Sequence, residues 1–242
     1  MIETGGLIRS LTGRRAARNY HTFVINEIGQ SIVGGVFPVG SVLANDTVMM
    51  EKYGVSRTVL REALKTLEAK GLVEARPKVG TRVSPRGRWN FFDPLVLAWH
   101  FDAPVEPRFH ESLFRTRAAL EKPMVELAAR HRTAEHVRLL KYWCRQMETA
   151  DDSLEQFGLA ALEVHGLIAE SSQDVLLRSV IGVVELTLAL ALTRDTALPG
   201  AEYRRQSAAL FLQLAGAIET GDAPAATTLF DATRALDRAQ VF

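Results

Sequence analysis

The chain has almost no cysteine and no long uninterrupted apolar run. Cys144 is the only cysteine among its 242 residues, so an internal disulfide is impossible and a reducing compartment is favoured. The most apolar segment, Val175–Thr193, contains Arg178 and Glu185 and lacks the roughly 18 successive apolar residues that a membrane helix needs. We therefore expect it to be a buried helix of a bundle. The first residues also lack the pattern of a secretory leader, so we expect a cytoplasmic protein that does not bind membranes.

The net charge of +1 is small, but it hides an asymmetry along the chain. Residues 1–90 hold 14 Lys and Arg against 7 Asp and Glu, a net charge of +7. Residues 91–242 hold 15 against 21, a net charge of −6. The basic third could meet a phosphate backbone, which would repel the remainder. Because basic segments are more often only solvated faces, the charge asymmetry by itself does not show that the chain binds nucleic acid.

The N-terminal third shows the element order of a winged helix-turn-helix. Apolar residues recur at helical spacing in three segments, and a glycine follows each of them. Asn45 or Asp46 can cap the second helix, and Ser56 can cap the third. Two short alternating segments then indicate a hairpin. The expected helices cover residues 20–33, 47–53 and 57–70, and the expected strands cover 72–76 and 81–83.

The composition divides the chain into four parts, and the fold class is mainly α. Residues 1–19 are rich in glycine and arginine and predict a flexible basic arm, with a tail of no particular role as the alternative. Residues 20–84 form the winged helix-turn-helix, and residues 85–103 hold a linker helix. Residues 104–242 show no strand pattern and predict an antiparallel all-helical bundle that binds an effector and dimerises. Its expected helices are 106–131, 134–150, 153–170, 174–194, 200–220 and 223–240.

Polar side chains gather at the start of the third expected helix, opposite its apolar side. Arg57, Thr58 and Arg61 share one face, and Lys65 follows one turn further along. A recognition helix places its N-terminal residues in the major groove, where arginine pairs with guanine edges. Exposed arginines often serve only solubility. Combined with the turn, the hairpin and the charge asymmetry, however, they indicate a DNA-binding surface.

The expected hairpin is also basic around its turn. Lys78 and Gly80 lie in the turn, between Arg76 and Arg82. A glycine there lets the backbone approach a duplex closely. We therefore add Lys78 and Gly80 to the predicted DNA-binding residues.

Three segments of this part closely resemble the GntR family of bacterial regulators. Two segments further on resemble the first and last helices of that family's FadR-like subgroup, whose C-terminal sensing (FCD) domain is all helical. The linker Ser84–Pro94 is similar to the branch that regulates galactonate and other sugar acids. The GntR-like segments are Val55–Leu64, Leu67–Glu74 and Gly80–Val83, and the FadR-like segments are Arg115–Pro123 and Ala217–Asp222.

The resemblance implies a homodimeric repressor that binds a palindromic operator. Recognition helices would enter the major groove, and wing tips, here with Thr81, would enter the minor groove. Arg57 and Arg61 match the family's base- and phosphate-contacting arginines. Where relatives have a Pro-Ser-Glu-Arg-like run this chain has Ala44-Asn45-Asp46-Thr47, so Thr47 occupies the position of a DNA-contacting arginine.

The subgroup's sensing domains often bind a divalent metal through one Asp and three His. The matching positions here are Ala161, His165, Phe211 and Thr233, and no histidine follows His165. Glu163 is no substitute, because on a helix it points about 200° away from His165. We therefore expect neither a metal nor another cofactor.

The resemblance also nominates residues for binding an effector. Arg117 matches an arginine that faces the subgroup's cavity, and it could bind a carboxylate bidentately or pair with Glu121. His165 could donate to a bound acid or be an ordinary core histidine. Phe211 would make the cavity more apolar, which admits an aromatic or acyl-bearing effector. The expected effector is thus a small organic acid. The alternative is a metal-free, acyl-CoA-responsive regulator, for which members of the family are a precedent.

Two other functions are alternatives to a ligand-responsive regulator. A helical enzyme is disfavoured, because the sequence has no glycine-rich phosphate loop, no nucleophile elbow and no paired ligand motif. A constitutive DNA-binding dimer without an effector stays open, because three metal-ligand positions are lost. We expect a regulator and not an enzyme.

Overall fold

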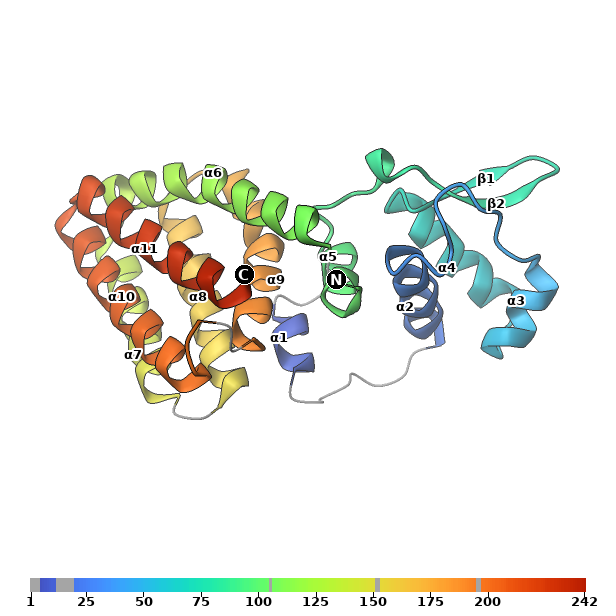
Figure 1. The fold of residues 1–242 in the computed structure, drawn as a ribbon. Helices are drawn as coiled ribbons and strands as arrows, with labels where there is room; N and C mark the ends of the chain where they lie inside the picture. The colour runs from blue at the N-terminus through green and yellow to red at the C-terminus, as the bar shows by residue number, and fades with distance from the viewer. Residues whose placement is uncertain (1–4, 12–19, 105, 151–152, 195–196) are drawn as a thin grey trace. The chain divides into compact units, whose positions relative to one another are not determined.

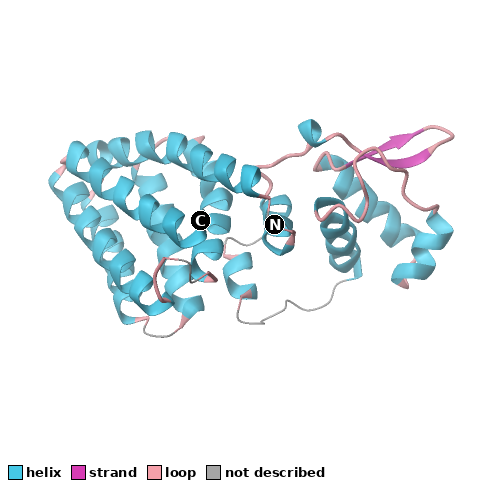
Figure 2. Ribbon diagram, in the orientation of Figure 1, coloured by secondary structure: helices cyan, strands magenta, loops and turns pink. Residues whose placement is uncertain are grey.

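The computed structural model describes residues 5–11, 20–104, 106–150, 153–194 and 197–242. These residues form two compact units, one within Arg15–Val105 and the other from Met1–Arg14 together with Glu106–Phe242 (Figure 1). Helices dominate both units and one small hairpin lies in the first (Figure 2), which confirms the expected fold class. Among the described residues, no helix is both long enough and apolar enough to span a membrane.

The first unit is a three-helix core with a hairpin. Its core is apolar, and Val24, Leu60, Leu67 and Val83 are fully buried in it. The two strands pair antiparallel from Val73 opposite Val83 to Arg76 opposite Gly80, and Val42 adds an isolated bridge to Arg82. The elements are α2 (Tyr20–Val33), α3 (Asp46–Tyr53), α4 (Arg57–Ala69), β1 (Val73–Arg76), β2 (Gly80–Val83) and a 3₁₀ turn at Arg86–Arg88.

Two caps shape the turn between α3 and α4. The Asn45 side chain accepts a hydrogen bond from the Val48 N–H at 3.0 Å, so Asn45 rather than Asp46 is the cap of α3. Gly54 ends α3 with φ 64°, a left-handed conformation that glycine adopts without strain. The Ser56 side chain then caps α4 through the Val59 N–H at 3.4 Å. The sequence therefore fixes the direction of α4 through local chemistry.

The expected linker helix is α5 (Pro94–Asp102), and it packs into the first unit. Trp99 is 2% exposed, and its indole Nε1 donates to Asn26 Oδ1 of α2 at 3.0 Å. A Cβ on Gly29 would lie within 2.6 Å of the Trp99 ring, so only glycine permits this approach. The helix is therefore part of the first unit's core and is not a separate connector.

The second unit is the all-helical bundle. α9 is its central helix, in which every residue after Ile181 is buried. α6 and α11 run side by side along one face (Figure 1). Asp174 accepts from the Leu176 and Leu177 N–H groups, and the segment up to Val180 is 3₁₀, so α9 is shorter than the expected 174–194. The helices are α6 (Pro107–His131), α7 (Ala134–Thr149), α8 (Leu154–Ser171), α9 (Ile181–Leu192), α10 (Gly200–Thr220) and α11 (Ala223–Val241).

The predicted flexible arm is wrong for its described part. Gly6–Ser10 form a short helix, α1, that packs on α8 and α9. Ile8 is fully buried, and Glu185 Oε1 accepts hydrogen bonds from the Leu7 N–H at 2.8 Å and the Ile8 N–H at 3.3 Å. Burial of an apolar side chain together with capping by a distant carboxylate explains the docking. The arm's three clustered arginines, Arg14, Arg15 and Arg18, lie outside the described residues.

Candidate nucleic-acid interface and sensor core

The exposed face of α4 carries the predicted reading residues. The side chains of Arg57, Arg61 and Lys65 are 67%, 64% and 69% exposed, and Thr58 is exposed beside them. The opposite face of α4 is fully buried against α2. The helix thus presents three cations and a hydroxyl to solvent from a rigid support, the arrangement that a major-groove reader needs.

Asp46, at the start of α3, lies between two of these arginines. Its Oδ2 is 3.5 Å from Arg57 Nε and 3.6 Å from Arg61 Nε. Exposed ion pairs of this kind contribute only about 0–1 kcal/mol, so a phosphate can compete with the carboxylate. Lys65 similarly contacts Glu62 at 2.8 Å, and that hydrogen bond lowers the pKa of Glu62. Sequence reasoning treated Asp46 only as a possible cap and missed its contact with both arginines.

The β1–β2 hairpin, which we call the wing, is held in place by its own polar contacts. Lys78 and Gly80 have φ angles of 62° and 109°, and both are exposed. Thr81 is partly exposed on β2, and the neighbouring Arg82 Nε donates to the Gly40 carbonyl at 2.8 Å. That bond ties the wing to the loop before α3. Thr47, the departure from the family pattern, is exposed in the first turn of α3.

A buried polar network, which we call the sensor core, occupies the interior of the bundle. Arg117 of α6 lies at its centre and is 1% exposed. Its Nε donates to Glu121 Oε2 at 2.6 Å, and its Nη1 donates to Asp237 Oδ2 at 2.6 Å. The same Nη1 lies 3.0 Å from the Thr187 hydroxyl. The Tyr203 hydroxyl donates to Asp237 Oδ1 at 2.8 Å, so four helices contribute to the network around Arg117.

His165 of α8 completes the sensor core, and its neighbours define its tautomer. Arg117 Nη2 lies 3.2 Å from His165 Nε2, and because arginine has only N–H donors the ring nitrogen must accept. The ring proton is then on Nδ1, which faces Glu121 Oε1 at 3.1 Å. The rings of Phe211 and Phe230 pack against the imidazole at centroid distances of 5.1 and 5.7 Å.

Opposite charges keep the sensor core ionised although it is buried. Burial alone would raise the pKa of Glu121, but Arg117 and then His165 lower it below its ordinary value. Burial would lower the pKa of Arg117, but Glu121 and Asp237 raise it. Burial and the Asp237 carboxylate raise the pKa of Tyr203 well above its ordinary value, so its hydroxyl stays a donor. These shifts favour the charged forms of Glu121 and Arg117 and the neutral form of Tyr203.

The residues around His165 do not fit a metal of the family type. Ala161, Phe211 and Thr233 are all buried there and offer no imidazole or carboxylate. Among the described residues, no three His, Cys, Asp or Glu side chains are grouped to hold a metal ion. The Arg117 guanidinium, 3.2 Å from His165 Nε2, already supplies a cation at this place and would repel another. Glu163 is exposed, as its helical position predicts.

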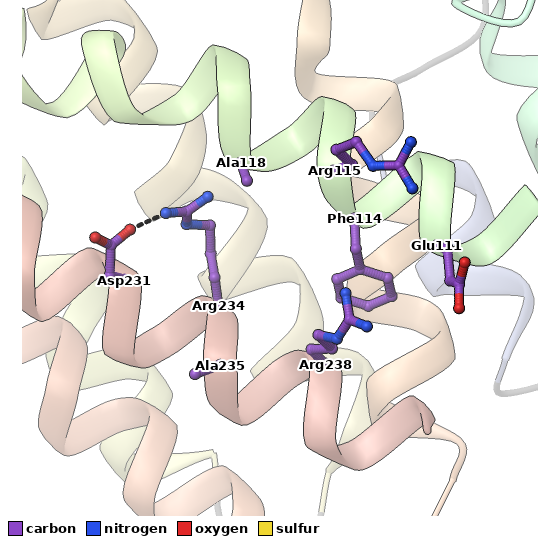
Figure 3. A pocket seen from close by; sticks show the side chains of 8 residues that line it. All are labelled: Glu111, Phe114, Arg115, Ala118, Asp231, Arg234, Ala235 and Arg238. Carbon is purple, nitrogen blue, oxygen red and sulfur yellow. Dashed lines mark hydrogen bonds and ion pairs between the residues drawn. The ribbon is translucent and has the colours of Figure 1, made fainter. Parts of the chain in front are cut away.

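A groove lies on the outside of the bundle, between α6 and α11. It has a volume of about 510 Å³, and Arg115, Arg234 and Arg238 line it together with Phe114 (Figure 3). Arg234 donates to Asp231, one turn earlier on α11. Sequence reasoning did not identify this groove, because its two walls are more than a hundred residues apart.

The structure brings together the three residues nominated for the effector. His165 contacts both Arg117 and Phe211 in the sensor core. Arg117, however, is already paired with Glu121, the alternative that the sequence left open. Asp237 was missed, because 120 residues separate it from Arg117 and no linear pattern connects them.

Comparisons with known proteins agree on the family. The family model for bacterial regulatory proteins of the gntR family matches residues 21–83, and the FCD domain model matches residues 112–234. The chain is 39% identical over 123 residues to the HTH-type transcriptional regulator YieP of Escherichia coli K12, a match that covers 50% of this chain and 52% of YieP. It is 26% identical over 155 residues to the galactonate operon transcriptional repressor of the same organism, covering 64% of this chain and 68% of that protein. These matches therefore span about half to two thirds of the relatives' length.

Two solved structures share the fold. The Lar protein of Listeria monocytogenes superposes with a TM-score of 0.67 at 16% identity, over 93% of this chain and 98% of Lar. The E. coli protein McbR/YncC superposes with a TM-score of 0.55 at 19% identity, with the same coverage of the two chains. From the two family models, the chain belongs to the GntR family and carries an FCD domain, so it is a DNA-binding transcriptional regulator and not an enzyme.

Proposed function

We propose that this chain is a repressor that binds a palindromic operator as a homodimer, and that a small organic acid bound in its C-terminal domain changes its operator affinity. The observation that carries the DNA-binding half is the exposed basic face of α4 on its buried support. The similar galactonate protein is a repressor, whereas the E. coli glc operon protein, 29% identical over 133 residues, is an activator. The sign of regulation is therefore tested separately, by transcription from the promoter with and without the chain.

In the proposed complex each residue of the interface has a defined role. Arg57 and Arg61 pair with base edges or phosphates in the major groove, and Thr58 and Lys65 bind phosphate. Thr47 contacts the backbone beside α4 with a hydroxyl in place of a guanidinium, which lowers the charge of that contact. In the wing, the residues that contact the minor groove are Lys78, Gly80 and Thr81. In a dimer the two α4 helices read half-sites about one helical turn apart.

The test measures binding of the full chain to its own promoter DNA by fluorescence anisotropy, over a series of salt concentrations. Arg61→Ala is expected to weaken operator binding by about 1–3 kcal/mol and to relax base preference. Lys65→Ala is expected to weaken binding to all sequences and to reduce the salt slope by about one unit. Lys122→Ala, an exposed cation on α6, is the matched control. Equal affinity for promoter and unrelated DNA at moderate salt would rule out operator recognition.

The effector half of the proposal centres on the C-terminal domain. A carboxylate that enters the sensor core must replace Glu121 or Asp237 at Arg117, with Phe211 and His165 forming its apolar and polar neighbours. Displacement of Asp237, which lies on α11, would release that helix from Arg117 of α6 and so bias the domain between two states. Thermal-shift measurements with sugar acids, aromatic acids and acyl-CoA, paired with operator binding, test this step.

A second candidate is a constitutive DNA-binding dimer with no effector. It is favoured by the packing of the sensor core, where the chain's own carboxylates bind Arg117 and two phenylalanine rings cover His165. For this candidate, none of these compounds would raise the melting temperature or change operator affinity. A single compound that does both would exclude it.

A further inference from the structure

The groove between α6 and α11 concentrates positive charge in an acidic part of the chain. Arg115 and Arg238 are exposed, and the side chain of Arg234 is 14% exposed. The two carboxylates of the groove, Glu111 and Asp231, lie at opposite ends with the arginines between them (Figure 3). With five charged groups the groove carries a net charge of +1, whereas residues 91–242 together carry −6.

Arg234 is incompletely satisfied where it is buried. It reaches from α11 towards Ala118 of α6 and binds Asp231 through Nη2 (Figure 3). Its Nε is buried and has no hydrogen-bond partner among the described residues. An unsatisfied buried donor on a charged group is expensive, and an anionic acceptor in the groove would remove that penalty.

The groove also offers an apolar surface beside its charges. Phe114 is 6% exposed, and Ala118 and Ala235 extend the surface on the two helices. The Phe242 ring packs against Phe114 at a centroid distance of 5.8 Å, and Arg238 lies over the Phe242 ring at 5.1 Å. The volume of about 510 Å³ is within the range of roughly 300–1,000 Å³ that small-molecule sites have.

We propose that the α6–α11 groove binds an organic anion, with Arg115, Arg234 and Arg238 on its carboxylate or phosphate and Phe114 against its apolar part. This inference rests on the proposed ligand response and moves its site from the sensor core to the outside of the bundle. The sensor core already holds two carboxylates on its one guanidinium, whereas the groove has three guanidinium groups for two carboxylates. An added anion is therefore attracted by the groove and repelled by the core.

The groove is coupled to the sensor core through Arg234. Burial lowers the pKa of Arg234, the Glu121 and Asp237 carboxylates of the core raise it, and Arg117 lowers it. Arg234 thus offsets part of the core's negative charge. An anion that binds Arg234 would offset its charge and change the electrostatic potential at these carboxylates, which gives ligand binding an effect on the sensor core.

The experiment measures anion binding by the full chain with calorimetry and thermal shift at constant ionic strength. The probes are benzoate, octanoate, phenyl phosphate and inorganic phosphate, which separate carboxylate from phosphate and test the apolar contact. The groove variant is Arg115→Ala/Arg238→Ala, which changes only exposed side chains. Arg130→Ala, an exposed arginine on α6 outside the groove, is the control, and Phe211→Leu changes the sensor core.

The proposal expects at least one organic probe to bind more tightly than inorganic phosphate. It expects the groove variant to weaken that probe by about 10- to 100-fold, the effect of losing a charged hydrogen bond, and Arg130→Ala to leave it unchanged. Binding that survives in the groove variant and is lost in Phe211→Leu would place the ligand in the sensor core, overturning the groove while the proposed ligand response stands. Failure of every probe to bind the wild-type chain would overturn the groove, and operator binding measured in the same samples would show whether the DNA-binding half of the proposed function holds.

Discussion

Replacing Arg117 by methionine removes the only cation from the centre of the sensor core. The wild-type guanidinium donates to Glu121 and to Asp237 at 2.6 Å each, and the three side chains are at most 2% exposed. Methionine has a similar length and no charge, so it fills much of the space and leaves two carboxylates buried without their partner. The variant therefore isolates electrostatics from packing.

The expected loss of stability is large. Removing one partner of a buried ion pair typically costs about 3–5 kcal/mol, because the remaining charge is left uncompensated. For a domain of about 150 residues, 1 kcal/mol corresponds to roughly 2–4 °C in melting temperature, so the second unit should melt roughly 6–20 °C lower. Arg130→Met on the same helix is exposed, and it should change the free energy of unfolding by less than about 0.5 kcal/mol.

The pH dependence provides the sharper test. In the wild type burial raises the pKa of Glu121, but Arg117 and His165 hold it below the ordinary value, so its stabilisation is present at neutral pH and is lost only when acid reaches that lowered pKa. In Arg117→Met, burial still raises the pKa of Glu121, but the guanidinium that mainly lowers it is absent. The folded state then binds protons before the unfolded state does, so the variant should gain stability from about pH 7 to about pH 5 while the wild type does not.

Calorimetric melts of the full chain across this pH range measure both effects. Adding Glu121→Gln and Asp237→Asn to Arg117→Met should restore much of the stability at neutral pH, because no uncompensated charge remains. A melting temperature within about 2 °C of the wild type, or equal pH slopes for variant and wild type, would refute the view that Arg117 neutralises the core.

Three further predictions concern the two units separately. Gly71 has φ 77°, and a Cβ there would lie 2.0 Å from the Arg88 carbonyl oxygen. Gly71→Ala should therefore lower the free energy of unfolding of the first unit by at least about 2 kcal/mol in urea titrations. Gly35 has φ 80° but open space around it, so Gly35→Ala should lower that free energy by only about 1 kcal/mol. Burial raises the pKa of Cys144 to about 12, so Ellman's reagent should label it only after unfolding, and rapid labelling of the native chain would contradict that burial. Ile8→Asp should undock α1, seen as faster amide exchange at residues 6–10 without lower operator affinity, and unchanged exchange would show that Ile8 does not hold the helix.

Most helices of both units could be predicted, because their signals are local; α1 and the start of α9 are the exceptions. In α4 the apolar side chains recur at helical spacing, and Ser56 and Gly71 mark its ends in the sequence as they do in the structure. The packing of α5 could not be predicted, because it depends on one missing Cβ at Gly29 opposite the Trp99 ring. The docking of α1 depends on Glu185, which is 178 residues from Leu7. A single sequence gives no measure of such distant complementarity.

The sensor core divides in the same way between local and distant contacts. Glu121 follows Arg117 by four residues on one helix, so their ion pair was an open alternative from the spacing alone. Asp237 reaches Arg117, and Tyr203 reaches Asp237, only because α10 and α11 fold back on α6. The resemblance correctly directed attention to His165 and Phe211 as interior positions, and the structure places their side chains against each other.

The identity of the cation at the centre of the bundle bears on how such a domain can respond to a signal. A ligand shifts an equilibrium only by as much as its affinity differs between the two states. A bound metal can leave, exchange or accept an effector as a ligand, whereas the Arg117 guanidinium is part of the chain and is already paired with Glu121 and Asp237. The sensor core can therefore change state only if one of these carboxylates is displaced or if the charge beside it changes. Arg234 is the group through which a ligand in the outer groove can change that charge. The sensor core has an arginine in place of an exchangeable cation, and the groove outside has more arginines than carboxylates, so Arg234 connects the two sites.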